Sequence, residues 1–214
     1  MAMVIGIMGE SGAGKTTSMR NLDPKTTFYC DCDKKGLSWK GWREQYRFEN
    51  GNYMKTDVPA TVLNVLKHIN EDEKQAHVKT VVIDTINGLM VADEMRRMKE
   101  KGYDKWQDLA TSIYFLFDYA LEMRDDVTVI FVAHTQTDVN ESGYMWTRIK
   151  TSGKKLDKIT IESKLPTVLY AKCVDGKYIF ETQSNFSTAK SPMGALEKEE
   201  PNDVAEILKK LEGY

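Results

Sequence analysis

Four short stretches of apolar residues stand out in the first two thirds of the chain. They are Val4 to Met8, Thr26 to Cys30, Thr80 to Thr85 and Val127 to Ala133. Within each stretch the apolar residues follow one another without strict alternation, which is typical of strands whose two faces are both buried. We therefore predict four central strands of a sheet that helices cover on both sides.

Segments with helical spacing lie between these strands. Thr16 to Leu22 is predicted to be a helix that the Asp23-Pro24 pair ends. Asp57 is predicted to cap a second helix with Pro59 in its first turn, and a third helix is predicted over Lys105 to Arg124. Their apolar faces contain Val62, Leu63, Val65, Leu66 and Ile69, and Trp106, Leu109, Ile113, Leu116, Phe117 and Leu121, respectively. Strands that alternate with helices predict an α/β fold with a mostly parallel central sheet flanked by helices.

The pattern changes after His134. Residues from Gln136 to Lys158 are polar and have no clear period, which predicts a loop with room for a short hairpin. Further on, the segments Thr167 to Cys173 and Lys177 to Glu181 flank the pair Asp175-Gly176. Because Asp-Gly suits the tight turn between two antiparallel strands, we predict a C-terminal β-hairpin there.

The last part of the chain ends in a helical pattern. Residues 184–201 are irregular, whereas the apolar spacing that follows predicts a closing amphipathic helix over about 202–212. With 214 residues, 41% of them hydrophobic, the chain is long enough for one sizeable core and short for two. We expect a single domain over residues 1–214, with its core at about 3–193.

Charge and cysteine content narrow the classes of protein. The net charge of -2 provides no overall field that would gather nucleic acid, so any polyanion must bind a local patch. Cys30, Cys32 and Cys173 are too few for a disulfide scaffold, and no secretory leader pattern is present, so we expect a cytoplasmic location. No apolar stretch approaches the ~20 residues that a membrane-spanning helix needs, and we expect no membrane role.

A glycine-rich segment, Gly9 to Thr16, connects the first predicted strand to the first predicted helix. Its glycines allow successive backbone amides to face phosphates, and the helix that follows adds its partial positive charge. Lys15 is expected to reach the outer phosphates and Thr16 to offer its hydroxyl to magnesium. A chance glycine-rich turn would lack this context, so we predict a site for ATP and Mg²⁺. The predicted nucleotide-binding residues are Gly9, Glu10, Ser11, Gly12, Ala13, Gly14, Lys15, Thr16 and Thr17.

Carboxylates follow two of the predicted strands. Asp84 ends the third strand, at the sheet edge where ligands of parallel sheets bind, and is expected to hold magnesium through water together with Thr16. Alternatively it caps a helix, a role that Thr85 and Asn87 could also serve. Asp31 and Asp33 follow the second strand, where either could orient the attacking water, or both could be solvated or capping residues. Cys30 and Cys32 lack the further ligands that a zinc site needs.

His134 ends the fourth strand at the same edge. There an imidazole could contact the terminal phosphate or relay its presence to the loop that follows, although a lone histidine is more often structural. Lys190 lies in an irregular stretch beyond the last strand. It could act in trans on the phosphates of a neighbouring subunit, or be an ordinary solvent-exposed lysine.

The loop after His134 is locally basic and carries Tyr144 and Trp146 upstream. Cations that pair with phosphates and aromatic rings that stack on bases suit single-stranded DNA, each stack contributing ~1 to 3 kcal/mol. An ordinary surface loop is the alternative, since Asp157 and Glu162 dilute the charge. The candidate DNA-binding residues are Arg148, Lys150, Lys154, Lys155 and Lys158.

Five motifs together carry a family resemblance. They are Gly9 to Thr16, Thr80 to Thr85, Phe131 to His134, Phe180 to Gln183 and Thr188 to Pro192. With these motifs the chain resembles the RecA-like P-loop ATPases. It is most similar to the small phage-type nucleotide-binding proteins that act as single-strand annealing or recombination ATPases.

The resemblance implies a set of roles. The catalytic carboxylate of the family falls on Asp33, where the family usually has glutamate, the polar sensor falls on His134, and the DNA-binding loop falls on about 137–158. Lys15, Asp33, Asp84 and His134 thus form the implied catalytic set. The implied activity is ATP hydrolysis in support of phage DNA recombination or annealing. It would take place in a homo-oligomer beside a single-strand-binding protein, in the cytoplasm of the bacterial host.

Two other functions remain open from the residues alone. One is a kinase of nucleotides or small molecules, although the arginines are scattered rather than gathered in a lid. The other is a nucleotide-dependent interaction module, such as a loader or packaging accessory, which binds ATP and a protein partner.

Overall fold

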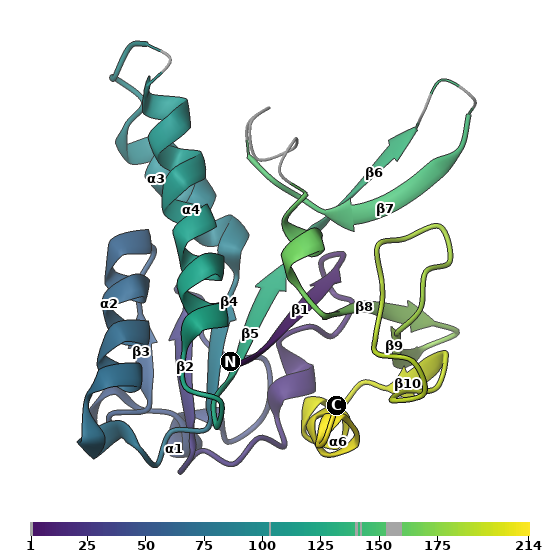
Figure 1. Cartoon of the computed structure of the whole chain (residues 1–214), viewed down its shortest axis with the longest axis horizontal. Coiled ribbons are helices and arrows are strands. Elements are labelled where there is room, and N and C mark those ends of the chain that lie inside the picture. The colour runs from purple at the N-terminus through teal and green to yellow at the C-terminus, as the bar shows by residue number, and fades with distance from the viewer. Residues whose placement is uncertain (1, 103, 140, 142, 153–159) are drawn as a thin grey trace.

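An eight-stranded sheet forms the centre of the computed structural model, which describes residues 2–102, 104–139, 141, 143–152 and 160–214 (Figure 1). The spatial order is β10-β9-β8-β1-β5-β4-β2-β3. All neighbours from β8 to β3 pair in parallel, whereas β9 and β10 pair antiparallel at one edge. The strands are β1 (Met3–Gly9), β2 (Thr27–Asp31), β3 (Tyr53–Lys55), β4 (Thr80–Asp84), β5 (Thr128–Ala133), β8 (Thr167–Val174), β9 (Lys177–Glu181) and β10 (Glu199–Pro201).

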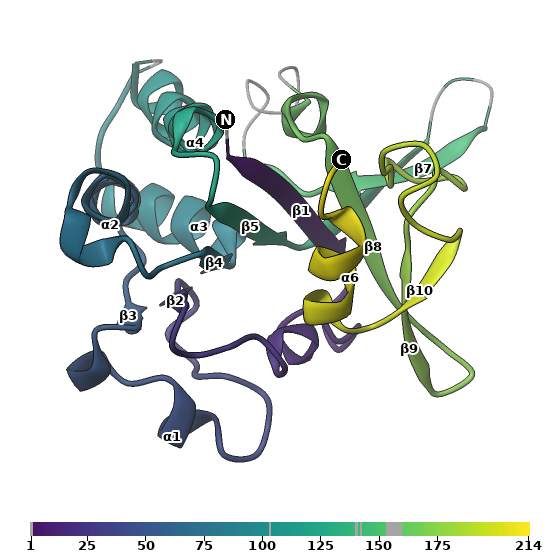
Figure 2. The same ribbon diagram turned by 60° about the horizontal axis from the view of Figure 1, so that its bottom comes forward.

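Helices cover both faces of this sheet (Figure 2). One face carries α2 (Pro59–Glu71), α3 (Ile86–Arg96) and α4 (Asp104–Glu122), and the other carries α6 (Val204–Leu211) and the 3-10 turn η1 (Thr17–Met19). The predicted α/β fold with a mostly parallel central sheet is therefore confirmed. The remaining short elements are α1 (Trp42–Gln45) and the 3-10 turns η2 (Phe48–Asn50), η3 (Glu73–Gln75) and η4 (Ile161–Lys164).

The central strands contribute to two cores, one on each face. In β1, Val4 and Met8 pack into the core beneath α2, α3 and α4, while Ile5 and Ile7 pack into the core beneath α6. All four are fully buried. Complete burial of such a side chain contributes about 1.5–3 kcal/mol, which explains why these strands are apolar at consecutive positions.

Two details of the predicted helices are wrong. Val58, not Asp57, is the N-cap of α2, and Pro59 is at its start. Asp57 instead forms ion pairs with Lys34 and Arg96, which lie far away in sequence. In α4, Trp106 is 39% exposed rather than part of the buried face. The structure also contains α3 and β3, which the sequence pattern did not indicate.

The helix predicted over 16–22 is replaced by the single 3-10 turn η1. The hydroxyl side chains of this turn form two hydrogen bonds. Ser18 donates to the carbonyl of Lys15, and the Thr17 hydroxyl pairs with that of Ser38 at 2.8 Å. Hydroxyl residues compete in this way with helical hydrogen bonds, and Pro24 prevents a longer helix. The phosphate loop is therefore followed by a compact turn.

Two hairpins complete the fold. The C-terminal hairpin of β8 and β9 is confirmed, with Asp175 and Gly176 both at positive φ, as their tight turn requires. The second hairpin, β6 (Thr135–Val139) and β7 (Met145–Ile149), is a separate two-stranded sheet that projects beyond the carboxyl ends of the central strands (Figure 1). Among the described residues, no helix is long and apolar enough to cross a membrane.

Candidate nucleotide-binding site

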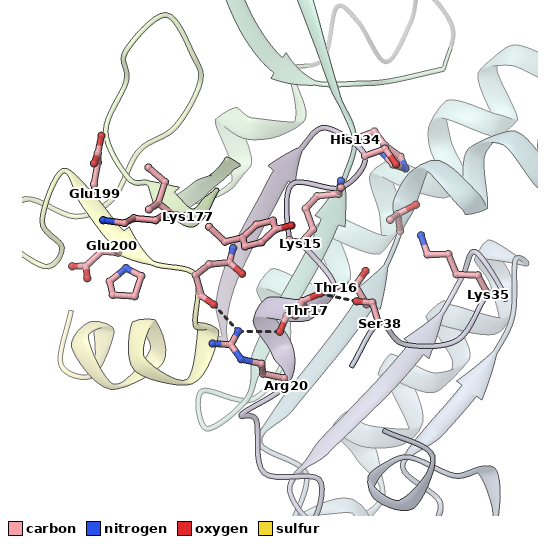
Figure 3. A pocket seen from close by; sticks show the side chains of 18 residues that line it. Lys15, Thr16, Thr17, Arg20, Lys35, Ser38, His134, Lys177, Glu199 and Glu200 are labelled. Atoms are coloured by element: carbon pink, nitrogen blue, oxygen red, sulfur yellow. Dashed lines mark hydrogen bonds between the residues drawn. The ribbon is translucent and has the colours of Figure 1, made fainter. Parts of the chain in front are cut away.

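A cleft of about 1050 Å³ lies at the carboxyl ends of the central strands (Figure 3). The phosphate loop, the turn after β2, the end of β5 and the β9–β10 edge form its walls. Lys15, Lys35 and His134 lie at one end of the cleft, and Lys177, Glu199 and Glu200 lie at the other. The sheet edge expected to bind the ligand therefore holds a large cavity.

The phosphate loop is shaped by close packing as well as by its glycines. Gly14 has a φ of 86°, and a Cβ there would lie 2.9 Å from a ring carbon of Tyr178. The loop therefore requires glycine at this position both for its backbone and for contact with β9. The Ser18 backbone N–H bonds to the Gly14 carbonyl at 2.9 Å, which joins the loop to the turn that follows.

Lys15 folds over its own loop. Its ammonium donates hydrogen bonds to the backbone carbonyls of Gly9 and Glu10, each at 2.7 Å. Burial lowers the pKa of Lys15, while the negative charge of Asp84 opposes this effect. A phosphate is a stronger acceptor than a carbonyl, so an incoming nucleotide can draw the ammonium from these carbonyls.

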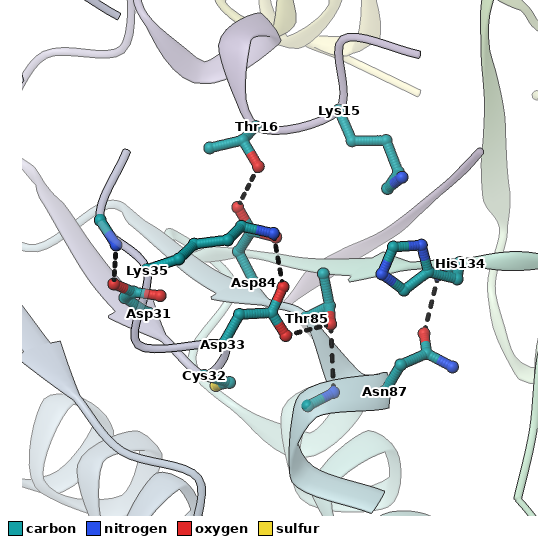
Figure 4. A network of polar contacts seen from close by, with 12 residues as sticks. Lys15, Thr16, Asp31, Cys32, Asp33, Lys35, Asp84, Thr85, Asn87 and His134 are labelled. Atoms are coloured by element: carbon teal, nitrogen blue, oxygen red, sulfur yellow. Dashed lines mark hydrogen bonds and ion pairs between the residues drawn. The ribbon is translucent and has the colours of Figure 1, made fainter. Parts of the chain in front are cut away.

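Asp84 lies beside the loop and is almost completely buried. Its Oδ2 accepts a hydrogen bond from the Thr16 hydroxyl at 2.7 Å (Figure 4) and another from the Tyr29 hydroxyl at 2.6 Å. Its Oδ1 is buried with no hydrogen-bond partner in the described part of the chain. Burial raises the pKa of Asp84, and the two hydroxyl hydrogen bonds oppose that rise.

This arrangement fits a magnesium ion bound with a nucleotide. Thr16 and Asp84 present oxygen atoms, which Mg²⁺ prefers, and the unused Oδ1 provides a further acceptor. No group of three or more histidine, cysteine or acidic side chains suited to a metal occurs among the described residues.

Asp84 does not cap a helix, because its neighbour Thr85 has that role. Thr85 is the N-cap of α3, because its hydroxyl oxygen accepts a hydrogen bond from the Gly88 N–H at 3.1 Å. The same hydroxyl donates to Asp33 Oδ1 at 2.9 Å. Thr85 thus positions both the helix and a neighbouring carboxylate, and leaves Asp84 to the phosphate loop.

The two carboxylates after β2 have different surroundings. Asp31 is buried and accepts hydrogen bonds from the Tyr53 hydroxyl and the Gly36 N–H, both at 2.7 Å. Asp33 is partly exposed and bonds to Lys35 and Thr85, both of which line the cleft (Figure 4). Of the two candidates for orienting water, Asp33 is the one within reach of a ligand.

His134 lines the cleft close to Lys15 (Figure 4). Its backbone N–H donates to the Asn87 side chain at 2.7 Å, which holds the end of β5 against α3. Burial, and then the charge of Lys15, lowers the pKa of His134. At neutral pH the imidazole is therefore uncharged and can donate or accept a hydrogen bond.

The candidate DNA-binding residues are placed only in part. Arg148 is buried, forms an ion pair with Asp138 on the opposite strand of the hairpin and lies over the Trp146 ring. Its side chain therefore stabilises the hairpin. Lys150 is exposed directly after β7, whereas Lys154, Lys155 and Lys158 lie outside the described residues.

Lys190 sits outside the cleft. Its backbone N–H and carbonyl both pair with Val168 of β8, at 2.9 and 2.8 Å, and its side chain is half-buried. Burial lowers the pKa of Lys190. The hydrogen bonds to β8 fix the position of its backbone beside that strand.

The sequence did not indicate that several other residues would line the cleft. Arg20 donates to the carbonyl of Asn202 at 2.8 Å, and Tyr178 and Asn202 reach Gly14 from the β9–β10 edge. None of these residues belongs to a recognisable motif. Lys35 could have been identified from the sequence, because it follows Asp33 in the turn after the same strand.

Comparison with known proteins agrees with this geometry. A search of curated proteins returned no match to the chain. A family model described as an AAA domain matches residues 1–193, which include the phosphate loop, Asp84 and His134. The chain therefore belongs to this family of AAA domains, which are nucleotide-binding domains of the P-loop ATPase class.

Proposed function

We propose that this chain is a RecA-like ATPase that hydrolyses magnesium-bound ATP and, in its ATP-bound state, binds single-stranded DNA through the β6–β7 hairpin. It would support strand annealing or recombination in a phage-infected cell, as a homo-oligomer beside a single-strand-binding protein. Two features support this function: the nucleotide cleft, and the β6–β7 hairpin that begins directly after His134 in the wall of that cleft.

One contact carries the proposal. Thr135, the first residue of β6, donates a hydrogen bond from its hydroxyl to the Glu10 carboxylate of the phosphate loop. The residue before it, His134, lines the cleft, and its carbonyl accepts a hydrogen bond from Lys150 N–H after β7 at 2.8 Å. A change in the phosphate loop is therefore transmitted to both strands of the hairpin at their base.

The far end of the hairpin offers surfaces that suit unpaired bases. Tyr144 and Met145 are exposed there, and the Tyr144 ring lies 5.5 Å from that of Phe186, which is also exposed. The backbone of Thr147 bonds to Phe186 and Thr188, which joins this aromatic pair to β7. Stacking of a base on such a ring contributes ~1–3 kcal/mol.

The roles in hydrolysis follow from the cleft. Mg²⁺, when bound by Thr16 and Asp84, would neutralise charge on the phosphates. Lys15 binds the outer phosphates after it leaves its loop carbonyls. Asp33 orients a water molecule and accepts its proton as the water oxygen bonds to the terminal phosphorus and ADP leaves. His134 donates a hydrogen bond at the terminal phosphate.

Hydrolysis and DNA binding test the proposal together. ATP hydrolysis is measured with and without single-stranded DNA, and DNA binding by fluorescence anisotropy at low and physiological salt. We expect DNA to stimulate hydrolysis, Lys15→Ala to abolish it, and Tyr144→Ala to remove only the stimulation and about tenfold of the DNA affinity. Tyr214→Ala, at an exposed tyrosine near the carboxyl end, is the matched control and should change neither.

A second function is favoured by the apolar character of the hairpin end. Val139, Tyr144, Met145 and Phe186 are all exposed there, while Arg148 is engaged with Asp138. Such a surface also suits a protein partner. If hydrolysis requires Lys15 but ignores DNA, and DNA does not bind at low salt, the chain is instead a nucleotide-dependent protein-interaction module.

A further inference from the structure

Two consecutive lysines after β2 point in opposite directions. The Asp31 carboxylate closes this turn on the N–H of Gly36, and Lys34 has a φ of 59°. With the backbone left-handed at this residue, Lys34 pairs with Asp57 at 2.5 Å and does not line the cleft. Lys35 extends into the cleft, where its ammonium lies 2.6 Å from Asp33 Oδ2.

The Lys35 ammonium faces the groups that surround the predicted terminal phosphate. Figure 4 places it between Asp33 and Asp84, across the cleft from Lys15 and His134. Partial burial lowers its pKa, but the hydrogen bond and charge of Asp33, followed by the charge of Asp84, raise it overall. Its positive charge in turn contributes to the lowered pKa values of Lys15 and His134.

The ion pair between Lys35 and Asp33 is weak enough for another anion to replace Asp33 as the partner of Lys35. The Lys35 side chain is 54% exposed, and an ion pair of this exposure contributes little to stability. A terminal phosphate carries more charge and more acceptor oxygens than one carboxylate, so it competes well for the ammonium. The fold itself does not depend on Lys35, because the turn is closed by Asp31 and Gly36.

We propose that Lys35 is a second phosphate-binding lysine, which holds Asp33 before nucleotide binds and moves to the terminal phosphate when ATP enters, opposite Lys15. This inference rests on the proposed ATPase function. ADP lacks the terminal phosphate, so it would leave Lys35 on Asp33.

The exchange also prepares the water-orienting group. When Lys35 leaves, Asp33 keeps its hydrogen bond from Thr85 on Oδ1 and has Oδ2 free to accept a hydrogen bond from water. Asp33 would therefore become able to orient water only when a terminal phosphate is present. ATP and ADP are in this way distinguished before any bond is broken.

Equilibrium binding tests the proposal without hydrolysis. Titration calorimetry with Mg²⁺ compares a non-hydrolysable ATP analogue with ADP. We expect Lys35→Ala to weaken the ATP analogue about tenfold, the loss of one charged hydrogen bond, and ADP less than twofold. Lys35→Arg should retain most of the affinity because it keeps the charge. Lys34→Ala, which removes the neighbouring lysine that points away, should bind as the natural chain does.

A double variant separates direct contact from an effect through Asp33. If Lys35→Ala acts only by leaving Asp33 unpaired, then adding Asp33→Asn will restore the affinity for the ATP analogue. If Lys35 contacts the phosphate, the loss persists in the Asp33→Asn background. Restoration, an equal loss for both nucleotides, or no loss would each overturn the proposal while leaving the ATPase function intact. A natural chain that binds neither nucleotide would overturn both.

Discussion

Asp31 and Asp84 end neighbouring parallel strands and are register partners in the sheet. Both are buried, and each accepts a hydrogen bond from a tyrosine hydroxyl, Tyr53 at 2.7 Å and Tyr29 at 2.6 Å, respectively. The same residue type therefore occupies equivalent places at the same sheet edge. Asp31 and Asp84 differ in the other hydrogen bonds that they accept.

Asp31 bonds to the Gly36 N–H and closes the turn after β2. Asp84 bonds to Thr16 of the phosphate loop and keeps one buried oxygen without a partner among the described residues. A buried polar atom without a partner is costly and is seldom retained unless something binds it. Two aspartates with equal burial can thus serve the fold in one case and the ligand in the other.

The largest expected effect comes from Asp84→Asn. The amide keeps the shape of the carboxylate but removes the charge that holds magnesium. We expect ATP hydrolysis to fall about 10²–10³-fold, the scale for loss of one electrostatic group in an active site. Steady-state hydrolysis and Mg²⁺ titrations of nucleotide binding measure this, and unchanged circular dichroism is the control. Full activity would show that Asp84 is structural like Asp31.

Asp31→Ala should lower the stability of the fold and leave ADP binding unchanged. It leaves the Tyr53 hydroxyl and the Gly36 N–H without a buried acceptor, so the free energy of unfolding should fall by about 2 kcal/mol. Urea denaturation measures the loss, and Asp125→Ala, at an exposed aspartate, is the matched control. Affinity of the folded protein for ADP, which does not contact Lys35, should change less than twofold. Loss of binding without loss of stability would contradict the assigned role.

Gly88→Ala tests the third carboxylate of this edge, Asp33. A Cβ on Gly88 would lie 2.4 Å from Asp33 Oδ1, so the carboxylate must move. The same Cβ would lie 2.8 Å from the Cys32 carbonyl oxygen, so the backbone before Asp33 must shift as well. We expect hydrolysis to fall about tenfold with ADP affinity preserved, because the water-orienting group is displaced and the phosphate loop is not. Met95→Ala, at an exposed position of the same helix, is the control. An equal fall in both variants would point to α3 rather than to Asp33.

The smallest effect is a pH dependence. Burial raises the pKa of Asp84 above 3.8, so the folded chain binds its proton more tightly than the unfolded chain. The stability contributed by this group is therefore present below 3.8 and decreases as pH rises through the folded-state pKa. Asp84→Asn lacks this dependence. Its stability relative to the natural chain should increase over that window in urea denaturation, and a constant difference would argue against a raised pKa.

The sequence was informative where function depends on neighbouring residues. Gly9 to Thr16 carries its phosphate-binding geometry within eight consecutive positions, and the apolar stretches identified the central strands. The hairpin at Asp175-Gly176 was likewise predictable from local turn chemistry. The helix predicted over 16–22 was wrong because hydroxyl side chains in this segment form competing hydrogen bonds that favour a single turn.

By itself, the sequence determined the phosphate loop, the parallel strands and the presence of acidic residues at their ends. Only the tertiary structure decided that Asp31 closes a turn while Asp84 faces the loop, and that Lys35 rather than Lys34 enters the cleft. It also brought Tyr178 to Gly14 from a distant strand. The reason is physical: a motif of adjacent residues is held together by the chain, whereas these contacts depend on strand order and on the direction of single residues within a turn.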